Sequence, residues 1–474
     1  MTDPALERLA DGVLLPGFAG PRVPDWLARA IDGGLGGVCV FASNVEAGFT
    51  GLTAELHARR PGFLIASDEE GGSVTRLEHA AGSSWPAAAA LGRLDDVVAT
   101  EAVAAGLGRQ CRAAGIDLVL APVADVNAEP ENPVIGIRSF GATADLVSRH
   151  TAAFVRGLQG AGVAAAAKHF PGHGSTTVDS HVALPTVAAD VATLRSRDLP
   201  PFAAAVGAGV RAVLTAHVVF PALDPAPATM SATVLGLLRT ELGFDGVVIS
   251  DALDMHAIAQ GIGRGPGAVA ALAAGVDLLC TGNPGFPTPY DDELGYREVR
   301  DAVLAALQDG TLSRARVEQA QQRVAELSGW IGARPVLPFT GTGAGSAVLR
   351  RVVDVVGDVG VGRGAHVVDL THGPGVAAGA HEPWLVAALR TRDASVTVGA
   401  VLDPLPAGRP VVALVDGPNA ALADLRAQRP DTVVVQIGLP VEGASVSPSV
   451  TLWGDGRVHA ETAADLLERT TDKG

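Results

Sequence analysis

The chain has few aromatic residues: Phe, Trp and Tyr make up 4% of its 474 residues, although 48% of the chain is hydrophobic. Its interior must therefore be built from layers of Ala, Val and Leu rather than from rings. Aliphatic layers of this kind are typical of parallel sheets that helices cover. The length exceeds one compact core and suits two or three domains, one of which could be a barrel of about 250 residues or more.

Positive charge is also scarce. The formal net charge is −16 and the isoelectric point is near 5.1. This balance argues against a nucleic acid or an anionic membrane as partner, because both select basic surfaces. A neutral or locally captured small molecule fits better. Apart from Lys473 beside the C-terminus, Lys168 is the single lysine in the chain, so position 168 has a specific need for an ammonium group.

Cysteines and long apolar runs are limited as well. Cys39, Cys111 and Cys280 are widely spaced and form no C-x-x-C pair, so we expect buried, reduced thiols. No run reaches the roughly 18 apolar residues that a membrane span requires. The first twenty residues have acidic side chains and no basic start, so no signal peptide is visible. We expect a cytoplasmic protein that is a monomer or a small homo-oligomer.

Short apolar runs alternate with amphipathic stretches in residues 1–330. The apolar runs are 13–18, 37–41, 63–67, 118–122, 163–168, 212–216, 247–250 and 276–279. The helical stretches include 96–114, 142–159, 191–208, 266–274 and 296–327. This alternation predicts a parallel sheet. The number of runs predicts an α/β fold of the (β/α)8 TIM-type barrel class for residues 1–330.

A Gly/Pro-rich segment without periodicity, 331–345, predicts a linker. Residues 346–474 then carry β-rich runs at 365–370, 396–400, 410–415, 432–437 and 449–453. Helical stretches at 382–392 and 420–427 separate these runs. The pattern predicts a smaller α/β sandwich domain of ordinary domain size. It lacks a dense cluster of titratable groups, so we expect it to cover or stabilise the barrel.

In a (β/α)8 barrel, functional side chains lie at the C-terminal ends of the strands. Polar residues follow the third to the eighth apolar run, which predicts that they meet on one rim. These residues are Asp68 to Glu70, Asp125 and Asn127, Lys168 and His169, His217, Asp251, and Thr281 with Asn283.

The loop from Lys168 to Gly174, continued by Asp179, Ser180 and His181, is the densest titratable cluster. Asp179 and His181 are separated by one residue, so their side chains lie on the same side of an extended segment and can meet. The carboxylate would fix the imidazole tautomer and favour the charged form, which gives a general acid/base that titrates near neutrality. An unpaired surface histidine is the alternative for this loop read alone.

Asp251 directly follows the seventh apolar run, where a side chain projects into the mouth of a barrel. A carboxylate there can act as a nucleophile toward an anomeric carbon and form a covalent intermediate. A helix N-cap is the alternative for Asp251. Asp254, one turn further on, fits a charge in the first turn of a helix.

A further set of residues could bind a ligand near these groups. Its donors and its acceptor suit sugar hydroxyls or an anionic ring substituent. The set is Asp68, Arg76, Arg138, Lys168 and His169.

The segments that carry these residues resemble glycoside hydrolase family 3, and within it the N-acetyl-β-D-hexosaminidase branch. The similarity covers residues 1–330, and its motifs are highly specific in combination. They are Asp68 to Leu77, Ala121 to Asn127, Arg138 to Gly141, Lys168 to His181, Thr215 to Val218 and Ile249 to Leu253. The sequence departs from the family pattern at Glu69, where Gln is usual, and at Ser73, where Arg is common.

The resemblance implies a retaining, exo-acting β-N-acetylglucosaminidase that needs no cofactor and no metal. Its substrate would be a small carbohydrate, such as a peptidoglycan fragment in cell-wall recycling or a chito-oligosaccharide, from which it removes terminal non-reducing N-acetyl-β-D-glucosamine. Asp251 would form a glycosyl-aspartate intermediate, His181 would protonate the departing oxygen, and Asp179 would support His181. The residues implied to bind the sugar are Asp68, Arg76, Arg138, Lys168 and His169.

Other functions remain open at this point. An imidazole acid/base is neutral after glycosyl transfer and does not repel an anion, so phosphorolysis is an alternative to hydrolysis. A broader β-glucosidase or hexosaminidase of the same family is another. A metal-dependent barrel hydrolase could use His169, His173, His181 and His217 as ligands. It is disfavoured because no histidine pair follows the first apolar run. A non-catalytic sugar-binding module is the last alternative.

Overall fold

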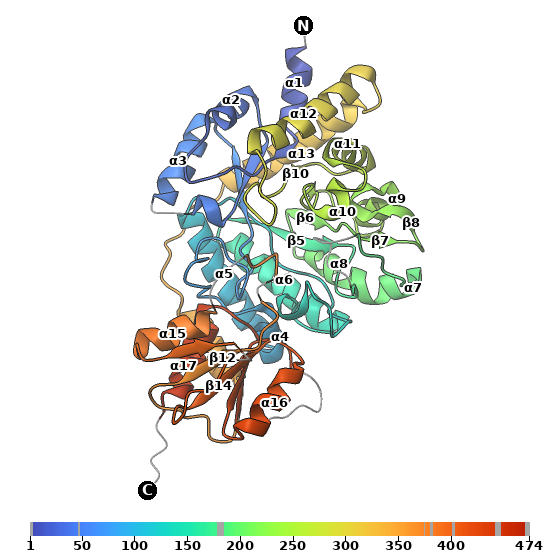
Figure 1. Ribbon diagram of the computed structural model, residues 1–474. Coiled ribbons are helices and arrows are strands. Elements are labelled where there is room, and N and C mark those ends of the chain that lie inside the picture. Colours follow the sequence, from blue (N-terminus) through green and yellow to red (C-terminus); the bar gives the residue numbers. More distant parts are fainter. Residues whose placement is uncertain are drawn as a thin grey trace.

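Two sheets organise the chain in a computed structural model (Figure 1). The structure describes residues 3–45, 48–177, 184–373, 375–379, 383–400, 403–440 and 447–469. The first two thirds of the chain form a barrel with surrounding helices. The remainder, orange to red in Figure 1, forms a smaller domain beside the end of the barrel that carries α4 (Ala88–Leu94).

Eight strands within the described ranges form the barrel, and they follow one another around it in sequence order. Each pair from the second strand to the seventh is parallel. The strands are β1 (Leu14–Leu15), β2 (Gly37–Val40), β3 (Leu64–Ser67), β4 (Leu118–Val119), β5 (Ala164–Phe170), β6 (Ala212–Thr215), β9 (Val247–Ile249) and β10 (Leu279–Cys280).

Three links close this sheet into a ring. A parallel bridge between Ile249 and Leu278 joins β9 to the residues before β10. β10 pairs with β1 in parallel, and the amide of Cys39 in β2 donates to the carbonyl of Pro16, directly after β1, at 3.0 Å. The (β/α)8 barrel that the sequence predicts is therefore confirmed.

The barrel interior is filled by small and branched side chains, as the low aromatic content predicts. Its buried cluster includes Leu15, Leu64, Ala166, Leu214 and Ile249 from the strands. Val324, Leu327 and Ile331, from the helix that ends the barrel domain, belong to the same cluster. The interior is therefore a packed core rather than a pore.

Helices and short turns connect the strands on the outside of the barrel. The helices in addition to α4 are α1 (Pro4–Asp11), α2 (Asp25–Gly33), α3 (Phe49–Arg59), α5 (Val97–Ala113), α6 (Ala144–Gly160), α7 (Val191–Thr193), α8 (Leu199–Gly207), α9 (Ala232–Gly236), α10 (His256–Ala259), α11 (Arg264–Ala274), α12 (Asp292–Asp309) and α13 (Arg314–Gly332). The turns are η1 (Ala42–Asn44), η2 (Gly136–Arg138), η3 (Leu194–Asp198), η4 (Ala228–Met230) and η5 (Leu237–Glu241), and β7 (Val219–Phe220) pairs with β8 (Asp224–Pro227).

The single helical stretch predicted over 296–327 is wrong, because the chain forms two helices there. α12 ends at Gly310, which has a φ of 81° and adopts the left-handed conformation that glycine tolerates best. α13 then starts after Ser313 and continues to Gly332. The apolar pattern runs through both helices and hides the break.

The second domain is a six-stranded sheet with helices on both faces. Its strand order is β11 (Asp354–Val356), β16 (Ser449–Thr451), β15 (Val433–Gln436), β14 (Val411–Val415), β12 (His366–Asp369) and β13 (Thr397–Gly399). All pairs are parallel except the one between β11 and β16. α15 (Trp384–Arg392) and α17 (Arg457–Leu467) pack on one face, and α16 (Ala420–Gln428) on the other. The predicted α/β sandwich is confirmed.

Residues 333–342 join the two domains without a helix or strand, and α14 (Gly343–Val352) then packs against α4, α5 and α17. The division at residues 330 and 345 stays a prediction. The segment before α4 also contacts the second domain. The amide of Ala87 donates to Nε2 of the buried His459 at 3.0 Å, and Arg457 contacts Glu78 and Ser84.

Two further expectations concern the described residues. Cys39, Cys111 and Cys280 are buried and unbridged, as the sequence predicts. Among the described helices, none has the length and apolar character needed to cross a membrane.

Candidate active site

A cavity of about 490 Å³ lies at the C-terminal ends of the barrel strands. It brings together six residues that sequence reasoning places in the site, from segments far apart in the chain. The second domain supplies Val376, Ala377 and Gly379 to the lining of the cavity. The six residues are Asp68, Arg76, Arg138, Lys168, His169 and Asp251.

Lys168 occupies the floor of this cavity. It lies in β5, is 3% exposed, and its Nζ contacts Asp68 Oδ1 and Glu70 Oε1, each at 2.7 Å. Asp68 and Glu70 follow β3 and are two residues apart, so an extended backbone turns both carboxylates to the same side. The ammonium group that the sequence isolates thus bridges two carboxylates.

The charges of this floor hold one another in the ionised state. Burial alone would raise the pKa of Asp68, but Lys168 and Arg76 outweigh it and lower that pKa. Burial also opposes ionisation of Glu70, and Arg138 with Lys168 lowers its pKa to about 2. Burial would lower the pKa of Lys168, yet the two carboxylates raise it. The floor therefore offers fixed acceptors and donors at neutral pH, which suit the hydroxyl groups of a sugar.

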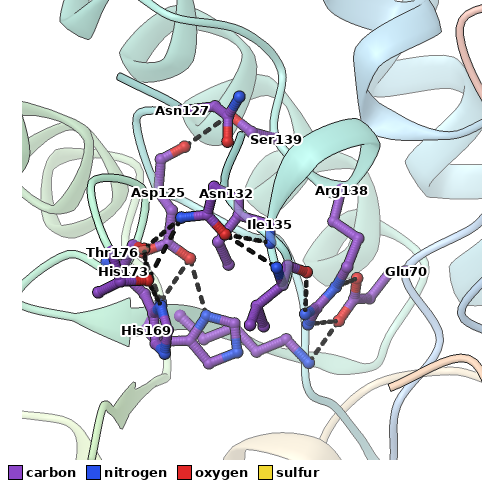
Figure 2. Close-up of polar contacts among 12 residues, drawn as sticks. Glu70, Asp125, Asn127, Asn132, Ile135, Arg138, Ser139, His169, His173 and Thr176 are labelled. Atoms are coloured by element: carbon purple, nitrogen blue, oxygen red, sulfur yellow. Dashed lines mark hydrogen bonds and ion pairs between the residues drawn. The ribbon is translucent and has the colours of Figure 1, made fainter. Parts of the chain in front are cut away.

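Two arginines extend the floor. Arg138 grips Glu70 with two parallel hydrogen bonds, from Nε at 2.9 Å and from Nη2 at 2.8 Å (Figure 2). Arg76 contacts Asp68 at 3.3 Å and donates from Nη1 to the carbonyl of Ala377 in the second domain at 2.8 Å. The orientation of Arg76 thus depends on both domains.

Asp125 clamps the loop that follows β5. It is fully buried and accepts hydrogen bonds from His169 Nδ1 at 2.7 Å and from the amide of His173 at 2.7 Å (Figure 2). Burial opposes its ionisation, but His169 outweighs burial and lowers the pKa of Asp125. A hydrogen bond from Nδ1 to this carboxylate leaves Nε2 as the ring nitrogen of His169 that can face a ligand.

The same loop is anchored at His173. Burial, and then the charge of His169, lowers the pKa of His173 to about 4, so this ring is neutral at physiological pH. Thr176 Oγ1 lies 2.9 Å from His173 Nδ1, and Asn132 Nδ2 donates to the carbonyl of His173 at 2.9 Å. These contacts fix the loop up to Thr176. The predicted dyad, Asp179 and His181, lies outside the described residues.

Asp251 lies two residues beyond β9, is partly exposed and lines the cavity. Its Oδ1 accepts from the amide of Ala252 at 2.8 Å, which orients the carboxylate. The N-cap alternative is wrong, because α10 begins at His256 and its cap position is Met255. Asp254 is likewise no first-turn charge. It precedes α10 and accepts from the amide of Asn283 at 2.8 Å.

Glu69, which departs from the family pattern, faces away from this charge network. Its Oε1 accepts from the amides of Arg76 and Leu77, at 2.6 and 2.7 Å, and its Oε2 accepts from Thr75 Oγ1 at 2.8 Å. Burial raises the pKa of Glu69 to about 7. The side chain therefore holds the backbone that carries Arg76.

Of the four histidines proposed as metal ligands, the three that the structure describes are engaged in other contacts, and His181 lies outside the described residues. Besides His169 and His173, both ring nitrogens of His217 have partners, with Nδ1 3.0 Å from Thr229 Oγ1 and Nε2 3.0 Å from the carbonyl of Ala252. Across the described ranges, no group of three or more His, Cys, Asp or Glu side chains is arranged to hold a metal ion. The described histidines thus give the metal alternative no support.

Sequence reasoning placed Glu70 and Asp125 on the rim and His173 in the titratable loop, but it did not predict the contacts that these three residues make. The spacing of Asp68 and Glu70 was a usable signal, because alternate residues of an extended segment share a side. Asp125 was visible as a polar residue after the fourth apolar run. Its partners, about 44 residues away in the next strand and loop, were not.

Comparison with known proteins places these features in a family context. The model of the glycosyl hydrolase family 3 N-terminal domain matches residues 27–327. A β-hexosaminidase of Xylella fastidiosa (strain 9a5c) is 36% identical over 339 residues, which cover 67% of this chain and 99% of the relative. β-Hexosaminidase A of Pseudoalteromonas piscicida is 34% identical over 319 residues, which are 62% of this chain and 53% of that protein, so the match spans about half its length.

A solved structure extends the similarity over both domains. The family 3 β-N-acetylglucosaminidase of Paenibacillus sp. strain FPU-7 superposes with a TM-score of 0.84 at 31% identity. The superposition covers 98% of this chain and 96% of that one. By contrast, the full-length match to the Xylella relative leaves about a third of this chain without a counterpart there.

Proposed function

The chain belongs to glycosyl hydrolase family 3, and on that premise we propose that it is a retaining, exo-acting β-N-acetylglucosaminidase. One observation carries the proposal. Asp251 shares a cavity of about 490 Å³ with the fixed donors and acceptors of the floor. The relatives that are named as β-hexosaminidases and as a β-N-acetylglucosaminidase support the same activity. A cavity of this size suits one or two sugar units rather than the middle of a long chain.

In the proposed reaction, Asp251 attacks the anomeric carbon and forms a glycosyl-aspartate ester. His181, supported by Asp179, gives a proton to the departing oxygen and then takes one from the incoming water. The two inversions at the anomeric carbon retain its configuration. The hydrogen bond from the amide of Ala252 to Oδ1 orients the carboxylate of Asp251 for this attack.

The floor of the cavity would bind the N-acetylglucosamine ring that is attacked. Asp68 and Glu70 accept from sugar hydroxyls, while Lys168, Arg76 and Arg138 donate. His169 presents Nε2 to the ring. Since these groups already hold one another in place, little side-chain entropy is lost when the sugar binds. We propose peptidoglycan fragments or chito-oligosaccharides as substrates. The cytoplasmic location and the monomer or small homo-oligomer stay predictions.

The test compares 4-nitrophenyl N-acetyl-β-D-glucosaminide with the matching β-glucoside for the wild type and for Asp251→Asn. We expect a clear preference for the N-acetylated substrate. Loss of the nucleophile should reduce kcat by a factor of about 1,000 or more. NMR of the released sugar should show the β-anomer first. A released α-anomer, or full activity of Asp251→Asn, would contradict the proposal. The same reaction in phosphate buffer, analysed for sugar 1-phosphate, distinguishes hydrolysis from phosphorolysis.

Labelling locates the covalent bond. A 2-fluorinated slow substrate should add one sugar mass to the peptide that contains Asp251, read by mass spectrometry. His181→Ala should slow substrates with poor leaving groups far more than those with good ones, because only the former need the proton. An equal loss for both would remove His181 from its proposed role.

A further inference from the structure

Arg264 is a cation in the wall of the cavity that forms no ion pair with any residue the structure describes. It is the first residue of α11 and lines the same cavity as Asp251. Its guanidinium stacks on the ring of Tyr290, 4.0 Å from the ring centroid. In the part of the chain that the structure describes, no carboxylate lies within 4.0 Å of that guanidinium.

Tyr290 does not supply the missing negative charge. Burial first, and then Asp254, raises the pKa of its hydroxyl, so the ring stays neutral at physiological pH. The hydroxyl lies 3.4 Å from the carbonyl of Thr281, which fixes the ring. Stacking on a fixed ring orients the guanidinium and leaves its N–H edge available to a ligand.

The cations of the floor differ from Arg264 in this respect. Lys168 bridges two carboxylates, Arg138 makes a bidentate pair, and Arg76 contacts Asp68. A balanced site of this kind suits a neutral sugar. An unbalanced guanidinium suits an oxyanion, because Arg forms strong paired hydrogen bonds with carboxylate and phosphate groups.

The position of Arg264 indicates which part of the substrate would carry the anion. Glu70 and Lys168 of the floor are buried, whereas Arg264 is partly exposed, and His256 and Gln260, which also line the cavity, are exposed. These exposed residues therefore mark the mouth of the cavity, where the leaving group extends toward solvent. We infer that Arg264 binds an oxyanion beside the scissile bond, on the leaving group or as the acceptor. The inference rests on the proposed function and deepens it.

Two sources could supply that oxyanion. A carboxylate on the leaving sugar would make Arg264 a specificity residue for acidic glycosides. Inorganic phosphate, which enters after the leaving group has departed, would make it a residue of the acceptor site. Both anions would form the same charge-assisted pair with Arg264 at the mouth of the cavity. Substrates that differ only in the carboxylate, tested with and without phosphate, distinguish the two anions.

The first arm uses two disaccharides, with N-acetylglucosamine β-1,4-linked either to glucuronic acid or to glucose. The wild type should favour the acidic one in kcat/KM by about fivefold, the upper end of what one partly exposed charge pair contributes. Arg264→Gln should bring this ratio to about one, and Arg264→Lys should keep part of it. Because the readout is a ratio within each variant, a general loss of activity cancels.

The second arm follows the glucose disaccharide while inorganic phosphate is added. If phosphate is the anion, the wild type releases sugar 1-phosphate and Arg264→Gln needs about fivefold more phosphate for the same rate. Arg156→Gln is the matched control in both arms. Arg156 is an exposed cation of α6 that pairs with Glu101 and does not line the cavity. Its ratios should equal those of the wild type.

The outcomes are separable from failure of the proposed function. A wild type that cleaves neither disaccharide nor the 4-nitrophenyl substrate disproves the proposed function itself. A wild type that hydrolyses both disaccharides at the same ratio as Arg264→Gln, with no Arg264-dependent effect of phosphate, overturns the inference alone. Raising the salt from about 0.05 to about 0.5 M should weaken any preference that Arg264 creates, because salt screens a partly exposed pair.

Discussion

The C-terminal ends of parallel strands carry acidic residues in both sheets, but the charges around these residues differ in sign between the two sheets. In the barrel, Asp68 and Glu70 lie against Lys168, Arg76 and Arg138, and the pKa of each carboxyl is lowered. In the second domain, Asp369 ends β12, Asp416 follows β14, and Asp455 lies beyond β16.

The difference shows most clearly at Asp455. Burial, and then the neighbouring charges of Asp416 and Asp369, raises its pKa to about 7. Cations keep the barrel carboxylates ionised as acceptors, whereas in the second domain neighbouring carboxylates oppose the ionisation of Asp455. An acidic strand end thus becomes a binding site through its counter-charges and not through its position in the sheet. The next three predictions test this contrast.

The largest effect is expected for Lys168→Met. The variant leaves two buried carboxylates with one cation fewer, and truncation of one partner of a buried charge pair costs about 3 kcal/mol or more. We expect kcat/KM on an aryl N-acetyl-β-glucosaminide to fall by a factor of about 100 or more. Steady-state kinetics measures this, with circular dichroism to show that the variant is folded. Activity within fivefold of the wild type would mean that the floor does not need its central cation.

A smaller and opposite effect is expected for Asp455→Asn in the second domain. The pKa of Asp455 in the folded protein lies above the ordinary value of 3.8, so the wild type loses stability as the pH rises from about 4 to about 7. Asparagine removes that loss. The variant should match the wild type near pH 4 and exceed it by about 2 kcal/mol at pH 8.

Urea unfolding at both pH values measures this difference. The matched control is Asp465→Asn, an exposed carboxylate of α17 that pairs with Arg392, and its effect should stay small at both pH values. A stability gain for Asp455→Asn that is the same at pH 4 and pH 8 would show that the acid is not protonated in the folded protein.

The smallest effect is expected for Glu69→Gln in the barrel. The pKa of Glu69 is about 7, against an ordinary value of 4.5, so the wild type also loses stability as the pH rises between these values. Glutamine removes the charge. Its NH2 group replaces one acceptor oxygen and so loses a hydrogen bond that Glu69 accepts. We expect a gain of about 1 kcal/mol at pH 8 and none near pH 4.

Thermal unfolding at several pH values checks this prediction, with the exposed Glu318→Gln of α13 as the control. A loss of stability at pH 8 would instead mean that the ionised carboxylate holds the segment of Arg76 and Leu77 in place. That result would place Glu69 among the balanced charges of the barrel rather than beside Asp455.

Much of the barrel could be predicted from the sequence because the relevant signals are local. Each apolar run forms one strand of the barrel. The polar residue after it lies on the rim, because the C-terminal ends of all eight strands lie at the same end of the barrel. Asp251, Lys168 and Asp68 were accessible in this way. The resemblance to a family added the pairing of roles among them, which spacing alone left open.

Other features depend on contacts that no local pattern encodes. Asp125 reaches His169 and His173 because β4 and β5 are neighbours in the ring, which the sequence states only indirectly. The break between α12 and α13 was hidden because a positive-φ glycine looks like any other glycine in an apolar pattern. The hydrogen bond between Arg76 and Ala377 joins positions 301 residues apart, across a domain interface.

That last hydrogen bond makes the second domain more than a passive cover. The acceptor of this bond is the main-chain carbonyl of Ala377, so substituting the Ala377 side chain does not remove it. The hydrogen bond is lost when the second domain moves or is exchanged. A chimera that joins this barrel to another second domain would lose the hydrogen bond from Arg76 Nη1. A chain shortened to the length of the Xylella relative would lose the same bond. In protein engineering, the two domains should therefore be transferred together, because neither can be exchanged without affecting the binding site.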